Sequence, residues 1–344
     1  MTDNSHDYIV LTHPPDAEML ERWENFLCNS TFATHYVTPD FFSDPFVGAG
    51  ERFVVLVTCK GQIDAVLSGL RQGRSISCGL TVRPQAAFRN GVDRASAASA
   101  LIAGLAEFDG SAEVVKLYSW DPIDGIDQFG YEHELCSGAD QVVMLDLSKG
   151  ADELFKEFSE RRRTDLRKTI KLGKIAVKQL ETEAELGELF TIHKDWNQRK
   201  GTQPEGFDAF KQMLSSEYRA TFIALFEGKI IAATYLRFCN GGVVEYAANN
   251  SLEEFQKLRP NELLGWWAIG WACSAGFKHF SLGACHPFLA RFGGNVVAAH
   301  RYRLDRTLFR RHKNRERVSR IAVNAYLSLP DSVRRRLKTA AARV

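Results

Sequence analysis

The sequence lacks the features that mark membrane-spanning and secreted proteins. No stretch of about 18 uninterrupted apolar residues occurs in the 344 residues, so we expect no spanning helix. The first ten residues, MTDNSHDYIV, are polar and acidic, with neither a basic start nor an apolar core, so a secretory signal is not expected. We therefore expect a cytoplasmic protein, with at most peripheral contact at the inner membrane surface.

Metal-binding patterns are missing as well. The seven cysteines are odd in number, scattered and without a C-x-x-C pair, and the nine histidines include no H-x-x-x-H pair around a carboxylate. Reduced structural thiols are the simplest interpretation, and the sequence predicts no metal site.

Charge is distributed unevenly. Residues 300–344 carry 14 Lys/Arg against 3 Asp/Glu, whereas residues 1–299 carry 30 against 39. An acidic body with a basic tail suggests that the tail meets something anionic, although a solvated helix would have the same composition. A membrane surface is one such partner, since Ile321, Ala325 and Tyr326 form an apolar stripe opposite Arg317. Packing of this stripe on the second half of the chain is the simpler expectation.

An internal repeat organises the chain. Four elements recur in the same order, displaced by 165–167 positions: a strand before an acidic helix start, a hairpin, a helix of small residues and a strand ending in proline. In the hairpins, Gly61 aligns with Gly228. In the helices, Gly104 aligns with Gly270, which predicts close helix–sheet packing in both copies. The sequence therefore predicts a tandem duplication of one α/β unit, each with a mixed sheet and helices on its faces.

Two segments lie outside the repeat. Residues 151–172 are predicted to form a single helix between the halves, with an apolar face made by Leu154, Phe155, Phe158, Leu166 and Ile170. A basic helix is predicted from residue 310 to Pro330, followed by a second helix capped by Asp331 or Ser332. These patterns divide the chain into residues 1–150, residues 151–310 and a basic helical tail, residues 311–344.

Three stretches carry a resemblance to a known family: FSERRRTDLRKTIKLG (158–173), EYAANNSLEEFQKLRPNELLGWWAIGWACSAGFKHFSLG (245–283) and FLARFGGNVVAAHRYRL (288–304). They resemble the GNAT superfamily of acyltransferases. More narrowly, they resemble the tandem proteins grouped as BioF2-like acetyltransferases, relatives of the FemABX aminoacyltransferases. The chain departs from that pattern at Ser281, where the family usually carries an aspartate.

The resemblance implies transfer of an acyl group to an amine, inside a cleft where two neighbouring strands separate. It places Glu245 and Tyr246 near the cleft, on opposite faces of one strand. Glu245 is the candidate general base, with a pKa that burial would raise, and Tyr246 is the candidate proton donor to the leaving group. His286, in the loop after the next strand, is a further candidate acid or base. The first half lacks an acidic residue on its matching strand, so we expect it to be degenerate.

Carrier binding is expected at the start of the helix that follows. Proteins of this superfamily hold pyrophosphate there with a glycine-rich loop, but this chain has Lys257-Leu258-Arg259-Pro260-Asn261 and no glycine. We predict that Lys257 and Arg259 hold phosphate with their side chains and that Asn261 caps the helix; a solvated loop is the alternative. The carrier is then acyl-CoA (acetyl-CoA) or a larger one, such as acyl carrier protein or aminoacyl-tRNA.

Four further residues are candidates for holding substrate: Asn249, Arg291, Arg163 and Arg167. The two last share a helix face with Lys171, which could follow a phosphate backbone or be a solvated face.

Three functions remain open at this point. The leading hypothesis is a cytosolic N-acyltransferase acting on an amine of a sugar, a peptide or a cell-envelope precursor, with its active cleft in the second half. The second is an aminoacyl-tRNA-dependent transferase of the peptidoglycan-bridge type. The third is a non-catalytic scaffold for envelope or polysaccharide assembly. None of them implies DNA binding.

Overall fold

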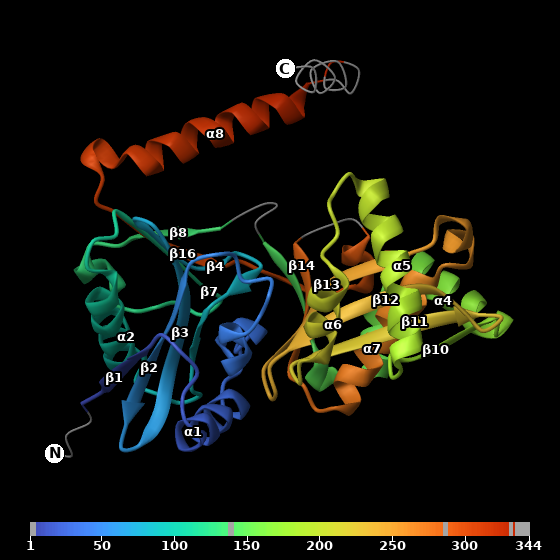
Figure 1. Cartoon of the computed structure of the whole chain (residues 1–344), viewed down its shortest axis with the longest axis horizontal. Coiled ribbons are helices and arrows are strands. Elements are labelled where there is room, and N and C mark those ends of the chain that lie inside the picture. Colours follow the sequence, from blue (N-terminus) through green and yellow to red (C-terminus); the bar gives the residue numbers. More distant parts are fainter. Residues whose placement is uncertain (1–4, 137–140, 285–287, 330–332, 334–344) are drawn as a thin grey trace.

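The chain folds into two α/β domains and a helix that stands apart from them (Figure 1). The computed structural model describes residues 5–136, 141–284, 288–329 and 333. The strands of the first sheet are β1 (Asp7–Leu11), β2 (Glu51–Cys59), β3 (Gln62–Gln72), β4 (Ser75–Leu80), β5 (Arg83–Pro84), β6 (Ala86–Phe88), β7 (Val114–Ser119), β8 (Glu132–Leu135) and β16 (His300–Asp305). Those of the second are β9 (Val142–Asp146), β10 (Ile175–Gln179), β11 (Arg219–Phe226), β12 (Lys229–Phe238), β13 (Val243–Ser251), β14 (His279–Ala284) and β15 (Asn295–Val297).

The α-helices follow the same division. The first domain has α1 (Ala17–Cys28) and α2 (Arg94–Asp109). The second has α3 (Ala151–Glu157), α4 (Glu160–Leu172), α5 (Glu183–Lys200), α6 (Phe207–Ser215) and α7 (Pro260–Ser274), and α8 (Arg311–Ser328) is the separate helix. Among the described residues, none of these helices is both long and apolar enough to span a membrane.

The duplication is visible in the strand order of the two sheets. The first runs β1-β2-β3-β4-β7-β16-β8 and the second β10-β11-β12-β13-β14-β9-β15. In both, the central pair (β4 with β7, β13 with β14) is parallel and its other neighbours are antiparallel. The predicted pair of α/β units with mixed sheets is confirmed.

The two hairpins repeat even their irregularities. Each turn has two residues with positive φ, Lys60 (50°) and Gly61 (80°) in the first and Glu227 (51°) and Gly228 (81°) in the second. Such turns match the right-handed twist of the strands, and glycine reaches this conformation without strain. In both hairpins the register also shifts within a few residues of the turn. The aligned glycines in the sequence therefore mark the same backbone geometry.

The sheets exchange one strand each. β9 precedes the second domain in the chain and pairs with β14, whereas β16 comes after it and returns to pair with β7 and β8. The boundary at 150, drawn from the sequence, therefore separates strands that pair with each other in both sheets. Each crossing strand covers an edge of the central parallel pair whose backbone groups would otherwise lack partners.

Helix packing differs between the copies. A Cβ on Gly104 of α2 would lie 2.6 Å from Val55 Cγ1 and 2.9 Å from Tyr8 Cδ2, so the predicted close packing is right there. A Cβ on Gly270 of α7 would meet nothing within 4 Å, so the same prediction is wrong for the second copy. In α7 the close approach is instead at Gly265, which faces the Phe292 ring.

The predicted single helix over residues 151–172 is two helices, α3 and α4. Phe158 is extended (ψ 146°), and Ser159 caps α4 by accepting a hydrogen bond from the Arg162 amide. The Ser159 amide is used outside the helix, donating to the Arg291 carbonyl at 3.0 Å. Of the predicted apolar face, Leu166 is buried but Ile170 is half exposed.

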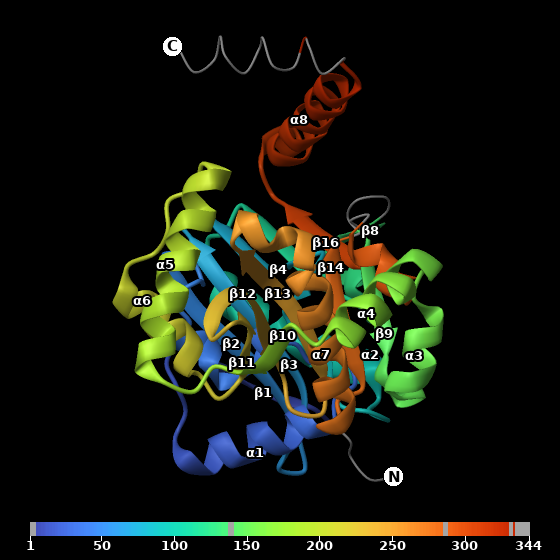
Figure 2. The ribbon, with the colours of Figure 1, turned by 90° about the vertical axis from the view of Figure 1, so that its right-hand side faces the viewer.

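The helix α8 does not pack its apolar stripe on the second domain. Ile321 is 62% exposed, and Figures 1 and 2 show the helix projecting away from both domains. The turn before it contains Phe309 and Arg310 with φ of 56° and 50°, which redirects the chain away from the body. The predicted second helix of the tail lies outside the described residues.

Candidate functional site

The central strands of the second sheet separate part of the way along. β13 pairs with β14 only over Val243–Glu245, whereas it stays paired with β12 as far as Ser251. The residues from Tyr246 onward therefore border a gap on the β14 side. At the same level the register of β12 and β13 shifts, and Ala247 has no partner in the ladder.

The first sheet fills the corresponding gap with its own chain. Strand β4 leaves β3 after residues Leu70–Gln72, and the short strand β6 takes its place by pairing with residues Ala65–Leu67 of β3. Strand β5 pairs with the end of β4, and both short strands contact β7. An open separation of the central strands is therefore found in the second domain.

Glu245 and Tyr246 point to opposite faces of β13, as predicted. Tyr246 is buried in the core beneath α7, next to Leu263 and Leu264. Burial raises the pKa of Tyr246 to about 12, although the nearby Thr234 side chain acts in the opposite direction, and no hydrogen bond of ordinary geometry holds the hydroxyl within the described part of the chain. The hydroxyl therefore stays protonated near neutral pH and is able to donate to a group entering the gap.

Glu245 faces the first domain and is held in an ion pair. Its Oε1 accepts a hydrogen bond from Arg83 Nε at 2.8 Å, and its side chain is 13% exposed. The charge of Glu245 raises the pKa of Arg83. Because Arg83 belongs to the first domain, this pair makes Glu245 a link between the two domains as well as a residue beside the gap.

A pocket of about 190 Å³ opens between the domains on this same face of the sheet. Its walls come from α5, from β11 to β13, and from Phe46 of the first domain. It reaches the irregular stretch Ala247–Asn250, so it includes the predicted substrate residue Asn249. The pocket and the separation of β13 from β14 thus meet at one place.

His193 is the titratable group of α5 that lines this pocket. Its Nε2 lies 2.8 Å from Glu205 Oε2 and its Nδ1 lies 3.2 Å from Asn250 Oδ1. Asn250 is fixed in turn by the Tyr235 hydroxyl, which donates to Oδ1 at 2.6 Å. A histidine oriented by a carboxylate and an amide has the arrangement of a general acid or base.

Buried charges line the interface beside the pocket. Arg219 of β11 donates to Asp44 Oδ2 at 2.8 Å, and His35 Nε2 lies 3.1 Å from the same carboxylate. Burial lowers the pKa of His35. Burial alone would raise the pKa of Asp44, but the hydrogen bond from His35 and the charge of Arg219 outweigh it and hold that pKa below its usual range.

Arg237 is a second buried cation in the pocket wall. It is 8% exposed, and its guanidinium donates to the Tyr36 hydroxyl. Among the described residues no carboxylate lies within ion-pair distance of it, because Glu245, its neighbour across β12 and β13, is paired with Arg83.

The start of α7 differs from the predicted cap. Arg259, with φ of 59°, is the N-cap residue, Pro260 occupies the first turn, and no side chain caps the helix. Asn261 is therefore not a cap: its Nδ2 donates to Ser251 Oγ at 3.2 Å. The first turn also holds Glu262, which pairs with the buried Arg162 at 3.4 Å.

A cationic cavity of about 200 Å³ lies beside this helix start. Lys257 and Arg259, both predicted to hold a carrier, line it together with Lys168 and Lys174. Arg259 also forms an ion pair with Asp165. The structure thus brings the two predicted cations together and adds two lysines to them.

Other predicted residues lie away from this cavity. The face of α4 that lines it is Asp165, Lys168 and Leu172, whereas Arg163 donates to the Lys156 carbonyl and the Arg167 guanidinium stacks on Phe155.

Arg291 is exposed on the turn Leu289–Phe292. His286 lies outside the described residues.

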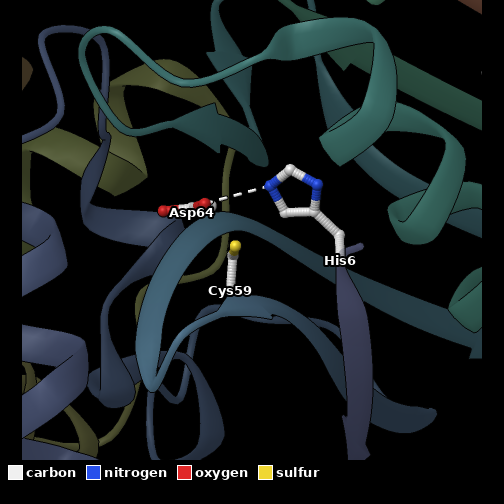
Figure 3. A group of neighbouring side chains, drawn as sticks. All are labelled: His6, Cys59 and Asp64. Carbon is white, nitrogen blue, oxygen red and sulfur yellow. Dashed lines mark hydrogen bonds and ion pairs between the residues drawn. The ribbon is translucent and has the colours of Figure 1, made fainter. Parts of the chain in front are cut away.

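Among the described residues, two groups of side chains have ligand atoms close enough to hold a metal ion: His6, Cys59 and Asp64, and His35, Asp40 and Asp44. Figure 3 shows the first group, with the His6 ring turned toward Asp64, 3.0 Å away. Each group already contains an arginine. Arg89 donates to Asp64 Oδ1 at 2.6 Å, and Arg219 occupies the other group. In each group the arginine already neutralises the carboxylate charge that would bind a divalent cation. We therefore interpret both groups as hydrogen-bonded networks.

Residues 156–303 match the family model described as an acetyltransferase (GNAT) domain. The second domain therefore has a GNAT-like fold. The crystal structure of FemX has a TM-score of 0.68 to this chain at 14% identity, covering 83% of this chain and 96% of its own.

Two further solved structures share the fold. The C-terminal domain of a putative lysylphosphatidylglycerol synthetase from Agrobacterium fabrum gives a TM-score of 0.60 at 14% identity, covering 85% of this chain and 93% of its own. L-PGS from Bacillus licheniformis gives 0.57 at 15% identity, covering 90% and 98%. At these identities the likeness is one of fold. No curated protein matches the chain significantly in sequence.

The second domain presents cations at the helix start instead of a row of backbone amides. Pro260 has no N–H, and the carboxylate of Glu262 already occupies the positive end of the helix dipole. The absence of the glycine-rich loop from the sequence therefore corresponds to a cationic surface at this helix start.

The His193 network of this domain was not found from the sequence. A signal for it exists in α5, whose buried positions Leu186, Leu189 and Ile192 are followed on the same side by His193 and Asn197. Polar residues that continue a buried helix face are unusual unless they are hydrogen-bonded or functional.

Proposed function

We propose that the chain is an N-acyltransferase that receives its acyl donor from the α7 side of β13 and its acceptor amine in the pocket between the domains. The observation that supports this most directly is the position of the pocket, which reaches β13 just where that strand leaves β14. A donor and an acceptor approaching from the two faces of the sheet would meet there.

The groups around the meeting point match the needs of acyl transfer. In the proposed reaction the acceptor amine attacks the acyl carbonyl, whose oxygen is polarised by the backbone amide of Ala247 at the register shift of β13. His193 takes the proton that the amine loses, and the Tyr246 hydroxyl supplies one to the leaving thiol or alcohol. Glu205 and Asn250 orient His193 for this task.

The acceptor is proposed to carry an anionic group besides its amine. Arg237 lines the pocket as a buried cation without a carboxylate partner among the described residues, and burying an unpaired charge is costly. A carboxylate or phosphate on a peptide, a sugar or a cell-envelope precursor would complete the pair.

The donor is proposed to be an acyl carrier bound through its phosphates in the cavity of Lys168, Lys174, Lys257 and Arg259. Acyl-CoA is the first candidate. Aminoacyl-tRNA is the second, favoured by side-chain cations that can follow a phosphate backbone. The name of one structural neighbour, a putative lysylphosphatidylglycerol synthetase, fits an aminoacyl group as cargo.

Thermal unfolding with each carrier distinguishes the candidates. A carrier present at about 100 times its Kd adds about 2.7 kcal/mol to the free energy of unfolding and raises the melting temperature. We expect acetyl-CoA or a longer acyl-CoA to do this, and K257Q to weaken the effect while the exposed lysine variant K156Q does not. Salt-sensitive binding of charged tRNA without any CoA effect would favour the second candidate.

Transfer itself is tested with a panel of amines bearing a carboxylate or phosphate and a labelled donor. H193A should lower turnover by about 10²–10⁴-fold with little change in donor binding. If no carrier stabilises the protein and no amine is acylated, the scaffold hypothesis replaces the enzymatic one.

A further inference from the structure

The helix α8 is tied to the body along one side of its first half. Lys313 donates to Glu132 at 2.6 Å, and Glu316 pairs with Lys116 and Arg303 of the first sheet. Lys313 and Glu316 are three positions apart, so they share one helix face. Figure 2 shows the remainder of the helix extending beyond the domains.

The opposite face of α8 is apolar and unusually exposed. Val318 is 66% exposed, Ile321 62% and Tyr326 37%. Arg311 and Arg315 lie seven and three positions before Val318 and continue the same line toward the start of the helix. Both arginines are exposed, and neither has an ion-pair partner within the described residues.

The turn that leads into α8 adds two large apolar side chains. Leu308 is 71% exposed and Phe309 82%. Phe309 also has a φ of 56°, a conformation that bulky residues rarely adopt. The protein therefore holds an aromatic ring in solvent at a backbone cost, beside the apolar face of the helix.

A cationic cavity of about 460 Å³ lies at this same end. Arg306, Arg311, His312 and Arg315 line it next to Leu308. A lipid headgroup phosphate is an anion that such a cavity can accept while Leu308 and the neighbouring ring enter the acyl region.

We propose that this tail surface, made of Leu308, Phe309, Arg311, Arg315, Val318, Ile321 and Tyr326, docks the protein on a membrane rich in anionic phospholipid. The helix lies in the interface with its apolar face toward the lipid, and the arginines meet the headgroups. The apolar stripe argues for lipid over RNA, since phosphate-backbone binding gains nothing from exposed valine, isoleucine and leucine. The cations argue against a second copy of the chain, whose own tail surface would repel them.

Co-sedimentation of the full chain with vesicles tests the proposal. We expect binding to vesicles of equal parts phosphatidylglycerol and phosphatidylcholine, weak binding to phosphatidylcholine alone, and a decline with added salt. I321D should weaken binding about tenfold or more. R311Q and R315Q should each weaken it about fivefold. V296D serves as the control, because Val296 of β15 is 55% exposed but lies outside the tail surface.

Three outcomes overturn the proposal. The first is absence of binding to the anionic vesicles, and the second is binding that I321D and the arginine variants leave unchanged. The third is a combined result, in which tRNA or inorganic phosphate abolishes vesicle binding and I321D binds RNA as well as the unaltered protein does. That result would assign the cations to a nucleic acid. Concentration-dependent self-association that I321D abolishes, without vesicle binding, would assign the surface to a second copy.

Discussion

Replacing Asp44 by asparagine should cost the protein about 3–5 kcal/mol of its free energy of unfolding. The carboxylate is fully buried and the Arg219 side chain is 3% exposed, with 2.8 Å between Oδ2 and Nη2. Asparagine keeps the shape but removes the charge, so Arg219 is left buried without its principal partner. Because Asp44 belongs to the first half of the chain and Arg219 to β11, the substitution should also weaken the contact between the domains.

Urea unfolding followed by circular dichroism measures this loss, and separate transitions would reveal weakened coupling of the domains. D40N is the matched control. Asp40 Oδ2 lies 3.9 Å from Arg219 Nε and its side chain is 15% exposed, so we expect about 1 kcal/mol or less. A loss below about 1 kcal/mol in D44N would falsify the view that this pair is an essential buried contact.

Three further predictions concern pH, glycine and the tyrosine hydroxyl. Burial lowers the pKa of His35, so the unfolded chain binds a proton more readily than the folded chain, and the free energy of unfolding should fall as the pH drops below about 6.5. Urea midpoints measured across this pH range check the prediction, and H35Q should flatten the trend. G104A should destabilise by about 1–3 kcal/mol because its Cβ meets Val55, whereas G270A should stabilise by up to about 1 kcal/mol, both measured by thermal unfolding. Y246F should change the free energy of unfolding by less than about 1 kcal/mol, because no hydrogen bond of ordinary geometry holds the buried hydroxyl among the described residues. It should lower turnover in the transfer assay if that hydroxyl protonates the leaving group.

The parts of the fold that local sequence determines were predictable. A two-residue turn with positive φ needs a glycine such as Gly61 or Gly228, and the flanking apolar strands must then pair. The strand exchange was not predictable in the same way. Nothing in the local pattern of β9 or β16 distinguishes a strand that pairs within its own half from one that crosses, because the choice depends on which edge is free in space.

The site was predictable to a similar degree. Alternation along a strand placed Glu245 and Tyr246 on opposite faces correctly, since that needs only the period of two. The partner of Glu245, however, is Arg83, 162 positions earlier, and no pattern within either half links them. His193 was missed for the same reason, because its significance depends on Glu205 and Asn250 arriving from other elements.

The exchanged strands have a consequence for the order in which the protein can be made. The edge of β7 is completed by residues His300–Asp305, which leave the ribosome only after nearly the whole second domain has done so. During synthesis the first domain must therefore wait with an open sheet edge, and a chain cut at residue 150 would never close it. The two halves have become interdependent in assembly, although each is a copy of the same unit.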